Sequence, residues 1–394
     1  MDRPLAALKI LDFTTLLPGP FATMMLADLG AEVVRIEAPN RPDMVRAMPP
    51  FDGDVSAWHA HLNRSKRSLA LDLKQPGAVN VVQRLVQNYD IVIEQFRPGV
   101  MARLGLDYPA FSRINPRVIC CSITGYGQTG PLKDRAGHDA NYLALAGVMS
   151  HTGRKASGPA GMGVQVADVG GGSFGAVVGI LSAVIQRQTT GIGQAIDISM
   201  FDMAVAWNGL ALAFQLVGGE NPTFENMPLN GGGYYDYYRT RDGRYLSVGS
   251  VEPKFWEGFC SAIGKSELAG MGYDPDPAVQ QALKAALRET IASKELAEWV
   301  AVFEQCDVCV EPVLTAAETL THPQTLARGL IVQVTRPDGT SQPQVGSPFR
   351  FSGSQAAYPH IGAPAGAHTN EVLAETGDTA EDIADMRVRG LFGD

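Results

Sequence analysis

Short apolar runs alternate with longer segments of helical pattern from residue 8 to residue 124. Helices are expected at 18–30, a segment that Pro18 opens and Gly30 closes, and at 75–88 and 108–114. The apolar runs are rich in Val and Ile and cover residues 8–14, 31–37, 68–73, 90–96 and 117–124. Runs of this kind are typical of strands covered on both faces, so the pattern predicts an α/β fold with a mainly parallel sheet.

The pattern changes between about residues 221 and 329, where glycines at 231–233 and a tyrosine-rich strand segment precede several helices. We expect a smaller α+β domain there. Residues 342–368 are rich in Pro, Gly and Ala and predict a covering arm, and 370–387 predict a terminal helix. The expected division is a large domain over 1–205, a small domain over 222–330, and a segment over 331–394 that returns to complete the large domain.

Composition and charge narrow the class of protein. The chain has 394 residues, 45% of them apolar, so it can bury a large core. Its 32 Lys and Arg stand against 41 Asp and Glu, and the net charge of −9 argues against a general binder of nucleic acid or anionic membranes. Five cysteines and the lack of a leader pattern or long apolar run favour a reducing compartment. We therefore expect a cytoplasmic protein without a nucleic-acid or membrane partner.

Two generic motifs carry little weight. Gly170, Gly172 and Gly175 spell GxGxxG, but they come after several α/β units and are followed by more small residues. This setting favours close helix packing over a dinucleotide site. Cys306 and Cys309 form a CxxC without the second ligand pair that zinc requires, so no metal site is predicted.

Three polar positions are candidates for chemistry. His138 and Asp139 follow Gly137 and begin a helical pattern, where backbone N–H groups and the helix dipole favour developing negative charge. Asp168 precedes a long apolar segment. This position suits either the N-cap of a helix or a catalytic acid. Glu252 lies between an expected strand and a helix that begins with proline. It is interpreted either as a solvated acid in the first turn of that helix or as a partner of the other two groups.

Basic side chains follow two of the expected strands. Lys74 and Arg97 each stand just beyond the carboxyl end of an apolar run, which is where open α/β sheets bind ligands. On an otherwise acidic chain, this placement indicates a ligand with a phosphate-rich handle.

The candidate residues lie within longer sequence motifs. The chain carries LKILDFTTLLPGPFATMMLADLGAEVVRIE, NRSKRSLALDLK, IEQFRPGVMARLGLDY and SITGYGQTGP. In this order, and over nearly its whole length, it resembles the class III coenzyme A transferase superfamily. Within that superfamily GHDANYLALAG, VADVGGG, TTGIGQAIDISMFD, YYDYYRTRDGRY and SVEPKF resemble the α-methylacyl-coenzyme A racemase branch. The transferase branch usually lacks a histidine at the position of His138.

The resemblance implies a Rossmann-like large domain built from both chain ends, a small domain, and an interlocked homodimer with its site between domains of different subunits. One departure is Ala38, where many relatives carry a basic residue; Arg41 is the nearby substitute. The family's coenzyme-binding positions fall on Leu71, Asp72, Leu73, Lys74, Arg97, Arg103, Gly137, Asn141 and Tyr142.

The resemblance also implies a reaction. A racemase of 2-methylacyl-coenzyme A thioesters needs two acid/base groups flanking one carbon, and His138 and Asp168 fit these roles. Glu252 or Asp139 would orient or tune them. Coenzyme A is part of the substrate, so neither a separate cofactor nor a metal is expected. The alternative is a coenzyme A transferase that works through an acyl anhydride on Asp168; a nonenzymatic coenzyme A-binding protein is a third hypothesis.

The sequence leaves the acyl group undefined. Tyr234 to Tyr238, Met200 and Met227 fit either an adaptable apolar acyl surface or the core of the protein.

Overall fold

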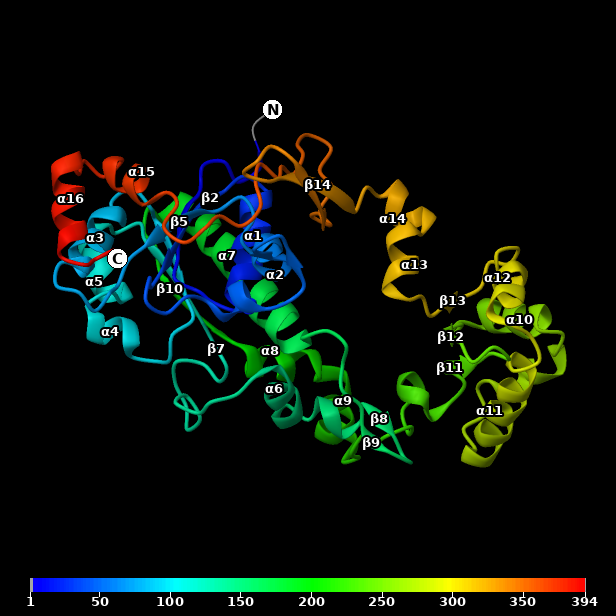
Figure 1. The fold of residues 1–394 in the computed structure, drawn as a ribbon. Helices are drawn as coiled ribbons and strands as arrows, with labels where there is room; N and C mark the ends of the chain where they lie inside the picture. The colour runs from blue at the N-terminus through cyan, green and yellow to red at the C-terminus, as the bar shows by residue number, and fades with distance from the viewer. Residues whose placement is uncertain (1–2, 394) are drawn as a thin grey trace. The chain divides into compact units, whose positions relative to one another are not determined.

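A computed structural model describes residues 3–393 of the chain, which fold into two units (Figure 1). Unit 1 contains the chain through Ala146, residues 162–206 and everything from Gln324 on. Unit 2 contains Gly147–Gly161 and Trp207–Pro323. The expected domains had placed 147–161 in the large domain and had begun the return segment at residue 331, whereas the structure assigns 147–161 to unit 2 and begins the return at residue 324.

Six strands form one parallel sheet in unit 1, in the order β10-β7-β6-β1-β2-β5. Leu11 at the centre pairs with Val34 on one side and Val92 on the other. The strands are β1 Lys9–Asp12, β2 Glu32–Glu37, β5 Arg67–Ala70, β6 Ile91–Glu94, β7 Ile119–Thr124 and β10 Ala195–Ser199. The chain moves outward from β1 through β2 to β5 and then returns to β6 on the other side of β1. The prediction of an α/β fold with a mainly parallel sheet is confirmed.

Helices cover both faces of this sheet (Figure 1). One face packs against α1 Pro18–Asp28 and α7 Gly175–Thr190, which also contact each other. The other face buries the core that lies under α3 Ala78–Leu85, α5 Tyr108–Ile114 and the C-terminal helices. Near-complete burial of β1, β2, β5, β6 and β7 explains their largely apolar sequence, whereas the edge strand β10 is mostly exposed or half-buried.

The small residues of the GxGxxG motif serve packing. A Cβ on Gly172 would lie 2.9 Å from the Pro18 side chain, and one on Gly175 would lie 3.2 Å from Ile198 of β10. The whole helical segment Val166–Thr190 is long and apolar enough to cross a membrane by length and composition, but 44% of its most apolar window is buried within the chain. Its small and apolar residues are those of a helix packed closely on a sheet.

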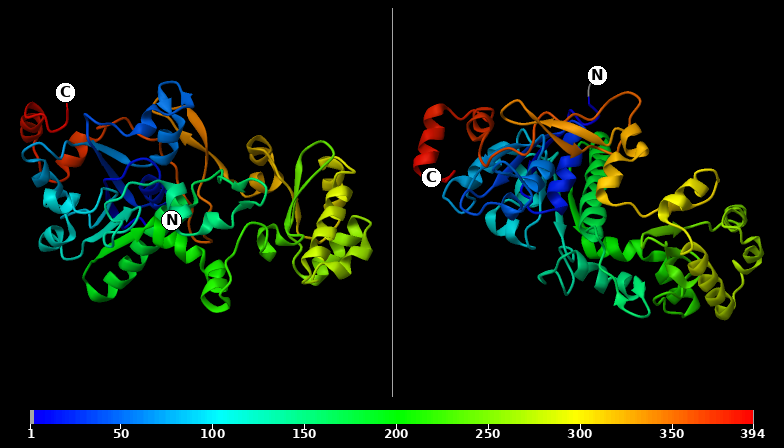
Figure 2. Two further views of the ribbon diagram at one scale, coloured as in Figure 1. Left: turned by 90° about the horizontal axis from the view of Figure 1, so that it is seen from below. Right: turned by 45° about the vertical axis from the view of Figure 1, so that its right-hand side comes forward.

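The C-terminal segment returns to the first third of the chain. Figure 2 shows the last helices, in red, beside the cyan helices in both views, and Arg84 of α3 forms an ion pair with Asp378. The expected helix at 370–387 is two helices, α15 Thr369–Ala374 and α16 Ala380–Val388, because Gly377 between them has φ +90°. The expected helix at 75–88 is shorter, since α3 begins only after Gly77, which has φ +95°.

Unit 2 has its own sheet and core. Strands β11 Asp236–Arg239, β12 Tyr245–Val248 and β13 Val310–Pro312 form an antiparallel sheet. Trp256 and Trp299, both almost fully buried, lie in the core cluster of this unit. The helices that carry most of this core are α10 Pro253–Ala262, α11 Pro277–Ile291 and α12 Leu296–Phe303.

Candidate active site

A cleft of about 470 Å³ opens in unit 1 where the strands of the sheet end. The segments that follow β1, β6 and β7 form most of its wall, and Met200 just beyond β10 completes it. The strand order reverses between β1 and β6, and open α/β sheets bind ligands at such a switch point. The lining residues include Leu16, Pro18, Gln95–Pro98, Ile123–Gly125, Lys133, Arg135, Gly137, His138, Asn141, Tyr142 and Asp168.

His138 lies at the mouth of this cleft, immediately before helix α6 Asp139–Leu145. The side chain is exposed, and its backbone N–H donates to Oδ1 of Asn141 at 3.0 Å. Gly137 fits before it because a Cβ there would lie 2.7 Å from the Tyr142 ring, whose hydroxyl donates to the Gly137 carbonyl. The predicted placement of His138 at a helix N-terminus is therefore confirmed.

Asp168 lines the same cleft from a helical segment with unusually wide turns, η3 Val166–Phe174, which runs directly into α7. It is the third residue of that segment, so its alternative interpretation as an N-cap does not hold. Burial and the nearby carboxylate of Asp139 raise the pKa of Asp168 to about 6, while His138 acts in the lowering direction. The side chain can therefore hold or release a proton close to neutral pH.

Asp139 connects the two candidate groups. Its Oδ1 accepts hydrogen bonds from the backbone N–H groups of Ala167 at 2.6 Å and Asp168 at 3.1 Å. Asp139 directly follows His138 in the chain, so one carboxylate fixes the start of the Asp168 segment against the start of the His138 helix. This link explains how an imidazole and a carboxyl group 30 residues apart come to one cleft.

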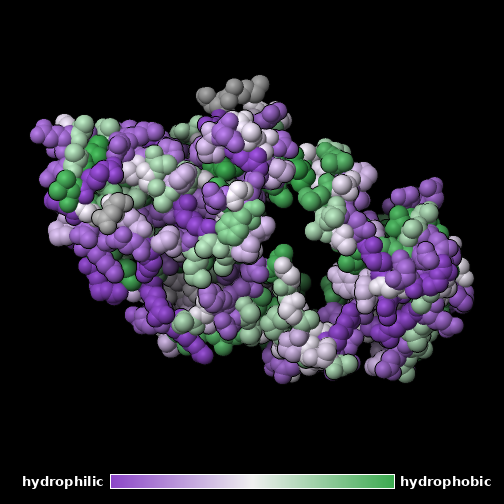
Figure 3. Space-filling model, viewed as in Figure 1, coloured by the Kyte–Doolittle hydropathy of each residue, from purple (hydrophilic) through white to green (hydrophobic). Residues whose placement is uncertain are grey.

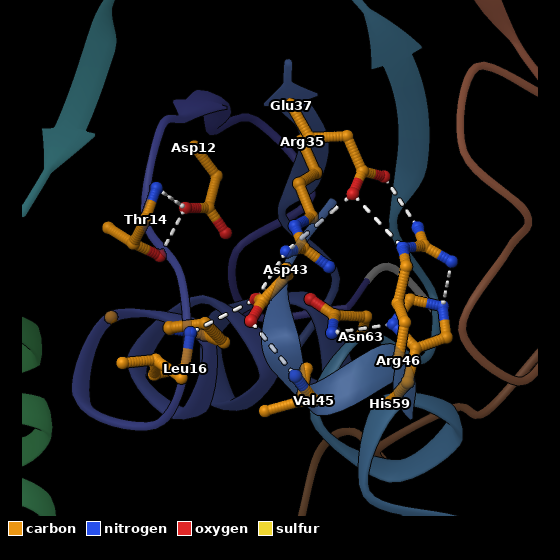
Figure 4. Close-up of polar contacts among 12 residues, drawn as sticks. Asp12, Thr14, Leu16, Arg35, Glu37, Asp43, Val45, Arg46, His59 and Asn63 are labelled. Atoms are coloured by element: carbon orange, nitrogen blue, oxygen red, sulfur yellow. Dashed lines mark hydrogen bonds and ion pairs between the residues drawn. The ribbon is translucent and has the colours of Figure 1, made fainter. Parts of the chain in front are cut away.

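Residues 13–19 comprise the loop that follows β1 and the first two residues of α1, and we call this segment the entry loop. Asp12 Oδ1 accepts from Thr14 N at 2.9 Å, and Asp43 Oδ2 accepts from Leu16 N at 3.0 Å (Figure 4). Leu16 has φ +61°, a conformation that costs energy for a residue with a side chain. The two buried carboxylates therefore hold the loop in a conformation that its sequence would not favour alone.

Replacing Asp43 by alanine should destabilise unit 1 by about 3 kcal/mol, because it removes the nearest carboxylate from buried Arg35 and leaves only that of Glu37, at 3.8 Å. Arg35 is only 1% exposed and donates through Nη2 to Asp43 at 2.6 Å. The same carboxylate accepts from Leu16 N and Val45 N. Urea unfolding would measure the loss. Asp43→Asn, which keeps an acceptor for these N–H groups, should lose less, and equal losses would contradict the role of the charge.

A second group of buried and partly buried polar side chains lies next to Arg35. Arg46 forms an ion pair with Glu37, and its Nη1 lies 3.0 Å from Nε2 of His59 (Figure 4). Burial, reinforced by Arg46 and Arg35, lowers the pKa of His59 to about 3, so this ring is neutral at physiological pH. None of these side chains lines the cleft, and they connect to the entry loop through Arg35, which lies 3.8 Å from Glu37 and donates to Asp43.

The predicted coenzyme-binding residues fall into two groups. Four of them, Arg97, Gly137, Asn141 and Tyr142, line the cleft together with His138 and Asp168. The others lie outside its lining: Leu71, Asp72, Leu73 and Lys74 follow β5 at the same end of the sheet, and exposed Arg103 lies in the last turn of α4 Val100–Leu104.

The remaining candidates lie elsewhere. Glu252 is the exposed residue that precedes α10 in unit 2. Arg41 is exposed, and its N–H donates to the Ala38 carbonyl. Tyr234 and Tyr238 are core residues of unit 2, while Tyr237 is 60% exposed. Unit 2 has a cavity of its own, of about 870 Å³, whose lining includes Met227, Tyr234, Tyr235, Tyr273, Gln280 and Lys284.

Sequence reasoning missed several residues of the cleft. Lys133 and Arg135 lie in its wall, in the loop just before His138, and they add positive charge beside Arg97. Their signal was two basic residues in the glycine-flanked segment 130–137. Gln95, whose Oε1 accepts from Gly19 N at 3.1 Å, gave no signal because its partner comes from a distant loop. Among the described residues, no group of three or more His, Cys, Asp or Glu side chains is placed to hold a metal ion.

An open parallel sheet with acid/base groups and cationic side chains at its switch point defines an α/β enzyme whose site lies at the carboxyl ends of its strands. The sequence profile of CoA-transferase family III matches residues 5–369. The chain therefore belongs to CoA-transferase family III, and the resemblance seen in its motifs is confirmed.

Relatives of different activity are similarly close to this chain. The alpha-methylacyl-CoA racemase of Homo sapiens is 36% identical over 388 residues, covering 96% of this chain and 95% of the relative. The acetyl-CoA:oxalate CoA-transferase of Acetobacter aceti is 34% identical, covering 92% of each. A solved CAIB/BAIF family protein from Brucella suis has a TM-score of 0.82 and 30% identity, covering 95% of this chain and 100% of that chain.

Proposed function

We propose that this enzyme racemises or epimerises 2-methylacyl-coenzyme A thioesters by moving a proton between the two faces of the α-carbon. The observation that carries the proposal is the pairing of His138 and Asp168 in one cleft, tied together through Asp139. The racemase from Homo sapiens, which matches nearly the whole chain, supports the choice of substrate class.

The chemistry needs two groups in complementary protonation states. One takes the α-proton, and the C–H electron pair becomes the double bond of an enolate whose negative charge rests on the thioester oxygen. The other then gives a proton to the opposite face of the carbon. A carboxyl with a pKa of about 6 and an imidazole can exchange these roles near neutral pH.

The enolate oxygen needs donors that are already in place. We assign this role to the backbone N–H groups at the start of α6, which follow His138 and point out of the helix end. The cations of Arg97, Lys133 and Arg135 in the cleft wall suit the phosphate groups of coenzyme A. Lys74 and Arg103 are proposed as further coenzyme contacts.

Exchange of the α-proton with solvent tests the proposal. One enantiomer of a 2-methylacyl-coenzyme A is incubated with the enzyme in heavy water, with no second acid present. We expect deuterium at the α-carbon and loss of optical activity. A lack of incorporation with every branched thioester tried would remove the racemase proposal.

Coenzyme A transfer is the second candidate, favoured by the transferase from Acetobacter aceti at nearly the same identity. Asp168 would attack the thioester carbonyl, release the coenzyme A thiolate and form an acyl anhydride. Hydroxylamine-sensitive labelling of Asp168, together with turnover that requires an added carboxylic acid, would support this reaction instead. His138 has no evident part in it.

Asp139 is proposed to tune Asp168 through its charge. The kcat/KM of the isomer for which Asp168 is the base should rise with pH through about 6, because only the carboxylate accepts a proton. Asp139→Asn keeps the acceptor oxygen for Ala167 and Asp168 but removes the charge that raises the pKa of Asp168. The rising part of the pH profile of kcat/KM should then move to lower pH by roughly one unit or less. An unchanged pH profile would show that Asp139 acts by hydrogen bonding alone.

We further propose a homodimer. Each unit exposes large apolar side chains: Val178 and Ile185 of α7 are 63% and 66% exposed, and Leu216 and Val217 of η4 Phe214–Gly218 are 83% and 91% exposed. Figure 3 likewise shows hydrophobic residues at the surface among polar ones. Light scattering should give the mass of two chains.

Glu252 remains a proposed partner of His138, and Glu252→Gln should lower racemisation if it orients the imidazole.

A further inference from the structure

The helical segment that carries Asp168 is wound more widely than an α-helix. In η3, Val166–Phe174, each turn closes over five residues instead of four, and the segment changes to α-helix at Gly175. Such winding is rare and occurs mostly in single turns at functional sites. A wide segment of nine residues therefore needs interactions that stabilise its winding. At its N-terminal end, Asp139 accepts hydrogen bonds from the N–H groups of Ala167 and Asp168.

Ser173 supplies an interaction at the other end. It is fully buried, and its hydroxyl donates to the Pro18 carbonyl at 2.6 Å and approaches the Asp168 carbonyl at 3.3 Å. Ser173 lies five residues after Asp168, one wide turn further along the segment. Beside it, Gly172 leaves room for the Pro18 side chain. The hydroxyl thus ties the turn that begins at Asp168 to the entry loop.

The backbone around Pro18 is itself held by hydrogen bonds on both sides. Its neighbour Gly19 donates to Oε1 of Gln95 at 3.1 Å, and Leu16 is held by the buried carboxylate of Asp43. Leu16, Pro18 and Gln95 all line the cleft that Asp168 enters. A hydroxyl bonded to Pro18 therefore fixes the Asp168 turn against this part of the cleft wall.

We propose that Ser173 is a positioning residue that holds the Asp168 carboxyl at its working place in the cleft. This inference rests on the proposed role of Asp168, which racemisation and coenzyme A transfer share. Without the hydroxyl, the wide turn can relax toward ordinary α-helical winding, and the carboxyl moves relative to His138 and the α6 terminus.

The test compares Ser173→Ala with Ser56→Ala. Ser56 is also buried and also donates to a backbone carbonyl, that of Met48, at 2.6 Å, but it does not line or contact the cleft. Both variants should lose stability in urea unfolding, and Ser56→Ala also loses the cap that its hydroxyl provides to the N–H of His59. Only Ser173→Ala should lower kcat, by about 10- to 100-fold, because small displacements of a reacting group are costly. Its KM should stay within about twofold, since the Ser173 hydroxyl bonds to the Pro18 and Asp168 carbonyls and to none of the proposed coenzyme contacts. Ser173→Cys, with a weak donor, should lie between alanine and wild type.

The wild-type enzyme is assayed for both reactions first, and the comparison is then made on whichever it catalyses. A second readout needs no turnover: carbon-13 NMR of the Asp168 carboxyl. Its pKa should change in Ser173→Ala, because the burial of the carboxyl and its distance from Asp139 both depend on where the turn lies, and should stay unchanged in Ser56→Ala. A kcat drop equal in the two variants, or an unchanged carboxyl titration in Ser173→Ala, overturns the proposal. Failure of α-proton exchange in the wild type overturns only the racemase function.

Discussion

Asp168→Asn should lower the rate of racemisation by about 10²–10⁴, the usual contribution of a general acid/base. The amide keeps the size of the side chain but can neither accept the α-proton nor supply one. Racemisation requires both faces of the carbon, so it should be lost from either enantiomer. His138 remains, and it should still exchange the α-proton of the one enantiomer whose C–H bond faces it, returning deuterium to the same face.

The variant should not unfold. The pKa of Asp168 in the folded protein, about 6, lies above its ordinary value of 3.8, so the folded state holds this proton more tightly than the unfolded state. Stability contributed by the protonated group is therefore present below the unfolded value and is lost as pH rises through about 6. Above that pH the carboxylate opposes folding, and the neutral amide should be at least as stable as wild type.

The measurement is deuterium incorporation and optical purity, followed together for both enantiomers. Racemisation at the wild-type rate would show that Asp168 is not the proton carrier. Equal exchange from both enantiomers without racemisation would mean that each of them can turn its C–H bond toward His138, which contradicts a fixed place for the α-carbon between the two groups. Coenzyme A transfer should also be lost in this variant, so Asp168→Asn tests the site and not the choice between the two reactions.

The sheet could be predicted from the sequence because its signal is local. The strands around Leu11, Val34 and Val92 are buried on both faces, and continuous apolar runs report that burial directly. The limits of helices were less visible. Positive φ values at Gly77 and Gly377 keep α3 from beginning earlier and separate α15 from α16. The sequence alone does not show which conformation a glycine adopts.

The site was predictable in its chemistry and not in its connections. His138 could be placed at a helix N-terminus from the residues around it, whereas the family resemblance was needed to pair it with Asp168. The carboxylate of Asp139 binding Ala167, and the hydroxyl of Ser173 binding Pro18, join segments 28 and 155 residues apart. No periodicity encodes such contacts, since they depend on where the sheet brings the loops.

His138→Gln should separate the two candidate reactions. Racemisation should fall by about 10²–10⁴, as with Asp168→Asn, because one of the two proton carriers is gone. Coenzyme A transfer through an anhydride on Asp168 should continue, since it needs no proton carrier at this position. The side chain is exposed, and the hydrogen bond from its backbone N–H to Asn141 is retained, so stability should change by about 0.5 kcal/mol or less.

The two variants should behave as mirror images. In His138→Gln, Asp168 should exchange the α-proton of only one enantiomer in heavy water, with retention of configuration. In Asp168→Asn, the other enantiomer should exchange through His138. If both variants exchanged the same enantiomer, the two groups would lie on the same side of the carbon. That outcome would contradict a mechanism in which the imidazole and the carboxyl face each other, because a proton taken and returned on one side cannot invert the centre.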